Sequence, residues 1–248
     1  TRLSVAARLS QASRSEIERQ FGDRFAEGRL KGACVGGAVR YQSGAFSQTD
    51  TRAASAGGTG KDYFTRLDET DEVKIRLAQR AAQEVEDGQI VLFDSGSTTL
   101  QVARSLRADI SITAVTASPM TAIALSEFKG VKVILAGGQL NPRTMAASGH
   151  EALRLLAGIR ADLAITGVCA IHPEVGITSL HFDEVPIKQA MFDSAAEVIA
   201  VTTADKLGAM EPFVVAPCNR LQRLVTEQEV PEVDIEGYRQ LGIEVLLA

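Results

Sequence analysis

The chain has 248 residues, of which 45% are hydrophobic and 23% charged, and its formal net charge is −5. No apolar run approaches the ~18 residues of a membrane span, and the opening TRLSVAARLSQ lacks the apolar stretch of a signal peptide, so we expect no membrane contact and no secretion. Three widely spaced cysteines, Cys34, Cys169 and Cys218, favour reduced thiols in a cytoplasm over disulfides or a metal site.

The charge is unevenly distributed. Residues 1–40 carry seven Arg and one Lys against four acidic residues, a local charge of +4, so the remainder carries −9. A basic N-terminal segment, which we call the head, joined to an acidic remainder favours a polyanion as the partner of the head. A solvated Arg-rich helix is an equal alternative on charge alone.

The basic head has the outline of a winged helix. Residues 3–10 and 13–27 are predicted to be two short helices, the second capped by Ser13 and ended by Gly28. The segments that follow, 29–30 and 34–41 around Gly36–Gly37, predict a small β-hairpin. We therefore place a winged helix-turn-helix domain in residues 1–42. Residues 43–60 are rich in Gly, Ser, Thr and Ala and are predicted to be a flexible linker.

Helices and strands alternate through residues 61–248. The predicted elements are helix 71–87, strand 89–93, helix 98–107, strand 110–116, helix 119–128, strand 131–136, helix 150–158, strand 162–167, helix 184–195, strand 198–203, strand 223–226, helix 232–240 and strand 243–247. Apolar strands separated by helices imply an α/β domain with a mainly parallel sheet that is covered on both faces. Ligands of such sheets bind beyond the carboxyl ends of the strands.

The segment 91–106, VLFDSGSTTLQVARSL, is the most informative of these transitions. A strand ends at Phe93, a turn of small polar residues spans Asp94–Thr99, and a helix follows. The unpaired N–H groups at the start of a helix and the positive end of its dipole attract a phosphate or carboxylate. A plain Ser/Thr helix cap uses the same residue types and is the alternative.

Other turns of similar composition follow other strands. They are Thr116–Ser118, Gly137–Gly138 and Thr203–Gly208, the last of which contains Lys206. Parallel strands place such turns at one edge of the sheet, where a pocket lined by hydroxyls, amides and a few charges suits a sugar phosphate. Lys188 is a second candidate partner for a phosphate, although an i,i+4 pair with Glu184 is favoured over that role from sequence alone.

No pattern indicates a metal or a cofactor, and we expect neither. The three histidines share no metal-ligand spacing with a cysteine or carboxylate. The nucleotide-binding and hydrolase motifs G-x-x-x-x-G-K-[ST], G-x-G-x-x-G and G-x-S-x-G are absent from the sequence.

The chain resembles the DeoR family of bacterial sugar-metabolism repressors. The matching segments are DSGSTT at 94–99, VTAS at 115–118, LAGGQLNPRT at 135–144, GHEALRLL at 149–156, RADLAITG at 160–167, GITS at 176–179, DEVPIKQAM at 183–191 and ADKLG at 204–208. The resemblance implies a winged helix that binds operator DNA, a domain related in fold to ribose-5-phosphate isomerase that senses a phosphorylated sugar or polyol, and a homo-oligomer. It implies an effector pocket formed by Asp94, Ser95, Gly96, Ser97, Thr98, Thr99, Thr116, Ala117, Ser118, Gly137, Gly138, Lys188 and Lys206.

The head departs from the family pattern. The family's recognition helix reads S-x-x-T-I-R-R-D-L, whereas residues 13–21 read SRSEIERQF, and the His that precedes the wing's Gly-Gly is Val35 here. A carboxylate that faces phosphates is repulsive, so we expect either that this chain no longer binds DNA or that its operator differs. The predicted DNA contacts are Ser13, Arg14, Ser15 and Arg19.

Three functions stay open from sequence. The first is a DNA-binding repressor controlled by a sugar phosphate. The second is a sugar-phosphate isomerase or a related CoA transferase, which needs a carboxylate base; the turn 167–170, GVCA, has none, but Glu174, Asp183 and Glu184 follow. The third is a sensor module that no longer binds DNA.

Overall fold

The computed structural model describes residues 31–35, 38–42, 61–70 and 72–248. The chain divides into two units, Thr1–Thr51 and Arg52–Ala248, and each is considered by itself. In the first unit, strands β1 (Lys31–Val35) and β2 (Ala38–Gln42) pair antiparallel, with Val35 opposite Ala38. The predicted hairpin is confirmed for the described residues, and its predicted segment 29–30 lies outside them.

The remaining predictions for the head lie outside the described residues. They are the helices 3–10 and 13–27, the linker 43–60 and the four DNA contacts Ser13, Arg14, Ser15 and Arg19. The domain limits at residues 42 and 60 also stay predictions.

A seven-stranded sheet forms the centre of the second unit. Its order is β14-β13-β11-β8-β3-β4-β5, and every neighbouring pair is parallel. The strands are β3 (Ile90–Phe93), β4 (Ile112–Thr116), β5 (Val131–Leu135), β8 (Ala161–Gly167), β11 (Ala195–Val201), β13 (Arg223–Thr226) and β14 (Glu244–Leu247). The predicted α/β class with a mainly parallel sheet is therefore confirmed.

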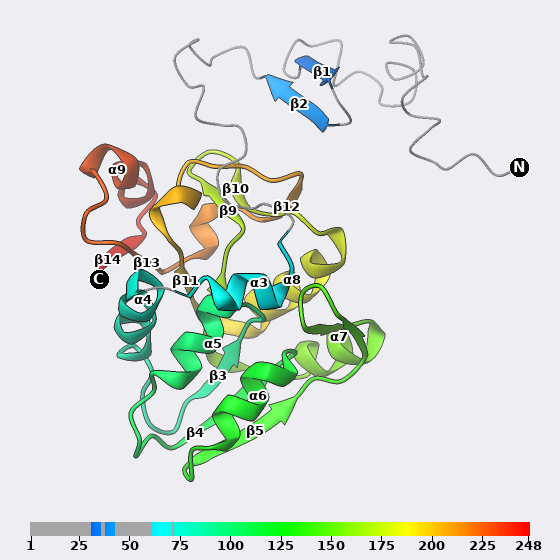
Figure 1. The fold of residues 1–248 in the computed structure, drawn as a ribbon, viewed down its shortest axis with the longest axis vertical. Helices are drawn as coiled ribbons and strands as arrows, with labels where there is room; N and C mark the ends of the chain where they lie inside the picture. The colour runs from blue at the N-terminus through cyan, green and yellow to red at the C-terminus, as the bar shows by residue number, and fades with distance from the viewer. Residues whose placement is uncertain (1–30, 36–37, 43–60, 71) are drawn as a thin grey trace, which may run out of the picture. The chain divides into compact units, whose positions relative to one another are not determined.

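Helices cover both faces of this sheet (Figure 1). On one face lie α4 (Glu72–Ala82), α5 (Ser97–Arg104) and α6 (Pro119–Ser126), and on the other α7 (His150–Ala157), α8 (Val185–Ser194) and α9 (Glu232–Gln240). Side chains of β3 alternate between the two cores, as strand geometry requires. Val91 and Phe93 pack with α4 and α5, whereas Leu92 packs in the core that contains Leu156 of α7.

The strand order reverses between β3 and β8. From β3 the chain builds outward through β4 to β5, then returns to add β8 on the other side of β3, and continues through β11 and β13 to β14. Adjacent crossovers that leave in opposite directions open a crevice at the carboxyl ends of these two strands. The topology therefore points to the ends of β3 and β8, at Asp94 and Gly167, as the place for a ligand.

Several short elements were not predicted. Helix α3 (Tyr63–Asp68) precedes α4; strands β6 (Gln139–Asn141) and β7 (Ala146–Ser148) form an antiparallel hairpin. Strands β9 (Ala170–His172), β10 (Gly176–Ser179) and β12 (Phe213–Ala216) form a separate antiparallel sheet. These short elements lie outside the alternation of strands and helices that marks the large sheet, and by themselves they carry too little periodicity to be found from sequence.

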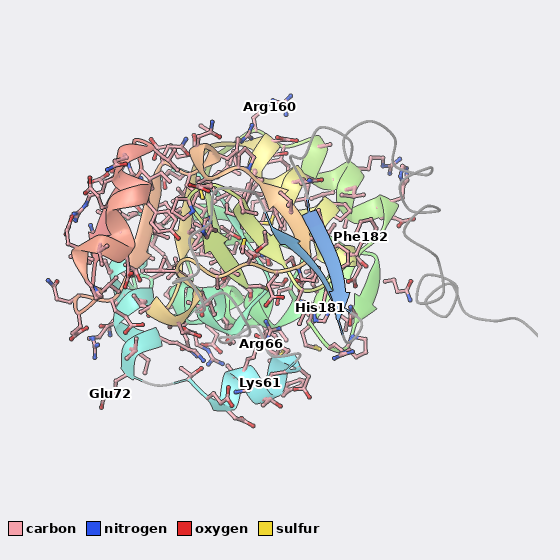
Figure 2. The ribbon with its side chains drawn as sticks, turned by 90° about the horizontal axis from the view of Figure 1, so that it is seen from above. Lys61, Arg66, Glu72, Arg160, His181 and Phe182 are labelled. Carbon is pink, nitrogen blue, oxygen red and sulfur yellow. The ribbon has the colours of Figure 1, made fainter. Side chains whose placement is uncertain are left out.

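Two further local predictions differ from the structure. The helix predicted over 71–87 ends at Ala82, because Glu84 and Val85 donate to carbonyls three residues back instead of four. The helix predicted from 184 begins at Val185, after a 3₁₀ turn, η2 (Phe182–Glu184), in which the Phe182 side chain is 68% exposed (Figure 2). Within the described ranges, no helix combines the length and the apolar character needed to cross a membrane.

Candidate functional site

A buried ion pair lies at the point where the strand order reverses. Asp94 follows β3 directly, and Lys188 on α8 forms an ion pair with its carboxylate. Thr166 at the end of β8 donates its hydroxyl to Asp94 Oδ2 over 2.9 Å, and Lys188 Nζ donates to the Gly167 carbonyl, also over 2.9 Å. The pair therefore connects β3, β8 and α8 across the crevice.

Lys188 keeps its charge in this environment. Burial by itself lowers the pKa of the ammonium, but the negative charges of Asp94 and Glu184 outweigh burial, so the pKa of Lys188 is raised above its ordinary value. The helical pair between Glu184 and Lys188, favoured from sequence, is not the contact that forms. Glu184 instead accepts the Ser179 hydroxyl over 2.9 Å.

The start of α5 has the features predicted for an anion site. Its N-cap is Gly96, which contributes no side-chain hydrogen bond. The next three residues, Ser97, Thr98 and Thr99, are buried, and the Thr99 hydroxyl has no hydrogen-bond partner among the described residues. The plain Ser/Thr cap is therefore not what this turn forms, and the N–H groups of the first turn keep their capacity to bind an anion.

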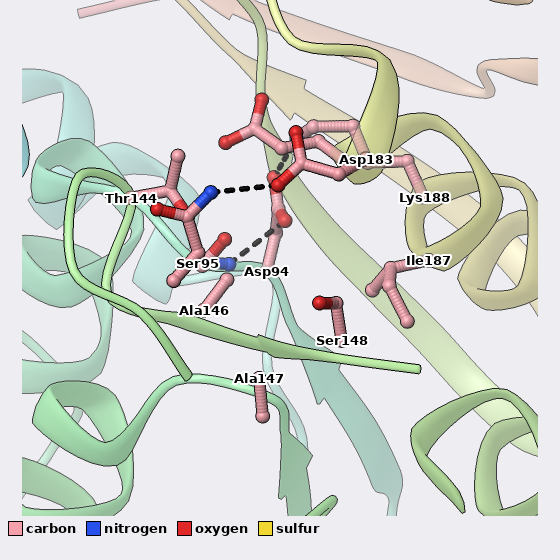
Figure 3. Close-up of a pocket in the computed structure, with 11 residues that line it drawn as sticks. Asp94, Ser95, Thr144, Ala146, Ala147, Ser148, Asp183, Ile187 and Lys188 are labelled. Atoms are coloured by element: carbon pink, nitrogen blue, oxygen red, sulfur yellow. Dashed lines mark hydrogen bonds and ion pairs between the residues drawn. The ribbon is translucent and has the colours of Figure 1, made fainter. Parts of the chain in front are cut away.

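A small pocket lies beside the ion pair, with a volume of about 10 Å³, room for about one water molecule, before it opens to solvent. Of the predicted residues, Asp94, Ser95 and Lys188 line it. The other lining residues come from the β6–β7 hairpin and from the region of η2 and α8: Asn141, Thr144, Ala146, Ala147, Ser148, Asp183, Glu184 and Ile187 (Figure 3).

The predicted turn Thr116–Ser118 has a structural role next to this pocket. Ser118 caps α6 by accepting from the Thr121 amide, and Thr116 Oγ1 accepts from the Ser118 amide over 3.0 Å. The Ala117 carbonyl accepts from the amide of Ala147 on β7 over 2.7 Å. This turn therefore holds the hairpin against the end of β4.

Gly137 and Gly138 lead into the hairpin and do not line the pocket. Gly138 has a φ of +136°, and a Cβ placed there would collide with the Ser148 carbonyl oxygen. The close approach of β6 to β7 explains the glycine at 138.

Lys206 lies in a 3₁₀ turn, η3 (Ala204–Lys206), after β11 and outside the pocket lining. Burial lowers the pKa of Lys206; Lys74 and Arg66 lower it further, and Asp205 opposes them. Of the two lysines, Lys188 contacts the end of β8 directly, through the Gly167 carbonyl.

Sequence reasoning missed Thr166 and the polar residues of the hairpin, and it named Asp183 and Glu184 only as possible bases of an isomerase. Thr166 is inside a predicted strand, where a hydroxyl gives no signal. The segments LNPRT and DEVPIK contain Asn141, Thr144 and Asp183. Their polar residues beside glycine and proline were the one feature of the sequence that could have indicated a site there. Cys169 and Cys218 are free thiols, as predicted, and burial raises the pKa of Cys218 to about 11.

A doubly wound parallel sheet with a buried ion pair and an open pocket at its switch point defines a small-molecule-binding α/β domain. Residues 69–228 match the family model described as the DeoR C terminal sensor domain. The chain belongs to the DeoR family of transcriptional regulators, which confirms the resemblance found in its sequence.

Individual relatives match over most of the chain. The HTH-type transcriptional regulator GlpR of Haloferax volcanii is 34% identical over 189 residues, 76% of this chain and 74% of that protein. The deoxyribose operon repressor of Escherichia coli K12 is 27% identical over 169 residues, 68% of this chain and 67% of that protein. With a relative from Escherichia coli O157:H7 the match covers 65% of that protein's length, just under two thirds.

Among solved structures, ribose 5 phosphate isomerase A from Neisseria gonorrhoeae is similar with a TM-score of 0.42 and 14% identity. That match covers 56% of this chain and 54% of the isomerase. A similarity of this extent carries no conclusion about activity.

Proposed function

We propose that this protein is a transcriptional repressor of carbohydrate-metabolism genes and that residues 61–248 sense a phosphorylated sugar or polyol. Family membership and the operon repressors among its relatives support the regulatory role. The observation that carries the sensor role is the Asp94–Lys188 pair at the switch point, beside an α5 N-terminus that no side chain caps.

The proposed effector site contains groups that bind the phosphate and groups that hold the strands and helices in place. The N–H groups of the first turn of α5, together with the hydroxyls of Ser97 and Thr98, bind the phosphate, with Lys206 as a further cation. Lys188 and Asp94 hold β3, β8 and α8 in the geometry that presents those donors. Since Asp94 neutralises Lys188, the ion pair itself contributes little net charge for an anion.

The DNA-binding half of the proposal rests on the basic head and on the family. We assign the operator contacts to Ser13, Arg14, Ser15 and Arg19 in a homo-oligomer that acts in the cytoplasm. Effector binding changes the affinity for DNA through a coupling free energy of typically ~1–3 kcal/mol, or roughly 5- to 150-fold in affinity.

Fluorescence anisotropy of the full chain tests this proposal, with a labelled duplex from its own promoter region and a scrambled duplex as control. We expect tighter binding to the promoter duplex, an affinity that falls steeply with salt, and a response to at least one sugar or polyol phosphate. If the chain does not bind the promoter duplex at low salt, the repressor role is refuted and the protein is a sensor module that no longer binds DNA. An identical effector response in Lys188→Ala removes the assigned site.

Sugar-phosphate isomerisation is the second candidate function, because the carboxylates of Asp183 and Glu184 line the pocket. Isomerases need such a base near the sugar carbonyl. In this structure Asp183 is engaged by Asn141 and Glu184 by Ser179. Turnover of ribose 5-phosphate by the pure protein, lost in Asp183→Asn or Glu184→Gln, would favour the enzyme over the sensor.

A further inference from the structure

One side of the pocket is built from polar groups that the phosphate site does not use. We call this side the hairpin wall: Asn141, Thr144 and Ser148 from the β6–β7 hairpin, with Asp183 and Glu184 from η2. Asn141 connects its two parts, because its Nδ2 donates to Asp183 Oδ2 over 2.6 Å and its Oδ1 accepts from the Arg143 amide over 2.9 Å.

The charge of this wall is wrong for a phosphate. Among the described residues that line the pocket, Lys188 carries the one positive charge, and Asp94 is already paired with it. Asp183 and Glu184 therefore add two further carboxylates, so the lining holds three carboxylates against one ammonium, a net charge of −2. Like charges repel a phosphate, whereas carboxylate, amide and hydroxyl groups together accept from and donate to the hydroxyls of a neutral carbon chain.

Thr144 adds an observation that points to a ligand. Its side chain is only 2% exposed, it lines the pocket, and its hydroxyl has no hydrogen-bond partner within the part of the chain that the structure describes. Burying a hydroxyl without a partner is unfavourable. The next residue, Met145, has a φ of +52°, a conformation that non-glycine residues seldom adopt, so the turn that presents Thr144 is itself held in an unusual shape.

We infer that the hairpin wall is a hydroxyl-reading subsite, which binds the neutral polyhydroxylated carbon chain of the effector while the phosphate binds at the start of α5. This inference rests on the proposed sensor function and gives it a specificity determinant. Thr144 and Asp183 bind ligand hydroxyls directly. Asn141 is a positioning residue, which fixes the turn of the hairpin to η2.

Calorimetric titration of the full chain tests the inference with inorganic phosphate and with phosphates of three-, five- and six-carbon polyols and sugars. We expect the wild type to bind at least one of the organic phosphates at least ~10-fold more tightly than inorganic phosphate. Thr144→Val and Asp183→Asn should each lower that preference by roughly tenfold or more, the size of one lost hydrogen bond to a charged or buried group, with binding of inorganic phosphate unchanged. Glu127→Gln, on an exposed residue at the end of α6, is the matched carboxylate control and should behave as wild type.

Thermal unfolding separates this role from a structural one. Removal of an unpartnered buried hydroxyl should leave the melting temperature of Thr144→Val at or above that of the wild type, while the variant binds the organic phosphate more weakly. If the wild type shows the preference and both variants keep it, the hairpin wall does not read hydroxyls, and the sensor function stands. If none of the phosphates binds to the wild type, both the proposed sensor function and this subsite are refuted.

Discussion

Replacing Lys188 with methionine tests whether the buried ion pair holds the switch point of the sheet together. Methionine is unbranched and uncharged, so the variant leaves the Asp94 carboxylate buried without its cation. Lys188 is 5% exposed and Asp94 is 2% exposed, which places the pair among buried ion pairs. Removing one partner of such a pair costs about 3–5 kcal/mol, whereas an exposed pair contributes about 0–1 kcal/mol.

The expected effect is large enough to measure by urea and thermal unfolding of the full chain. For a unit of this size, 1 kcal/mol changes the melting temperature by about 2–4 °C, so Lys188→Met should lower it by roughly 6–20 °C. Arg107→Met is the surface control, since Arg107 and its partner Asp87 have side chains that are 47% and 55% exposed, and it should leave the melting temperature nearly unchanged.

The double variant Asp94→Asn/Lys188→Met tests why Lys188→Met lowers the free energy of unfolding. If the loss comes from an uncompensated buried charge, removing both charges should recover most of the free energy of unfolding. The pH dependence gives a second check. Because the pKa of Lys188 is raised in the folded state, its contribution is complete at neutral pH and is lost only as the pH rises through that value, above 10.5. A cost below about 1 kcal/mol for Lys188→Met, or no recovery in the double variant, would refute the reasoning.

Three other predictions concern the phosphate site, the hairpin and the head. Because the pKa of Lys206 is lowered, mainly by burial, sugar-phosphate affinity measured by calorimetry should begin to decline at a lower pH than the ordinary lysine pKa of 10.5 would give. Lys206→Arg should remove this decline, and an unchanged profile in that variant would exclude the contact. Gly138→Ala should lower the free energy of unfolding in urea by about 1–3 kcal/mol, because its Cβ would collide with the Ser148 carbonyl and its φ is positive. The control Gly137→Ala has open space around its Cβ and should change that free energy by no more than about 0.5 kcal/mol. Equal costs would contradict this account of the hairpin. Arg14→Ala and Arg19→Ala should each weaken binding to the promoter duplex and reduce the slope of log affinity against log salt by about 1, and unchanged slopes would exclude these contacts.

The sequence predicted the elements that depend on local pattern. Each of the seven strands of the large sheet was expected close to its observed position, because an apolar run followed by an amphipathic helix is a local signal. The turn at Asp94–Thr99 was also visible, since small hydroxylated residues and glycine between a strand and a helix are typical of an anion site. Lys206 and Lys188 were named from the sequence as possible partners for a phosphate, and the resemblance to the DeoR family implied the same two residues.

Only the tertiary structure decided which of these residues meet. Asp94 and Lys188 are 94 positions apart, and their contact depends on β8 returning to the side of β3, which no local pattern encodes. The same holds for β10 and β12, whose residues Thr178 and Val214 pair although helix α8 and strand β11 lie between them in the sequence. Hydrophobic periodicity is a property of neighbouring residues, so it fixes where strands and helices begin and end. The order of strands, and with it the hairpin wall and the buried ion pair, is set by how distant segments share one core.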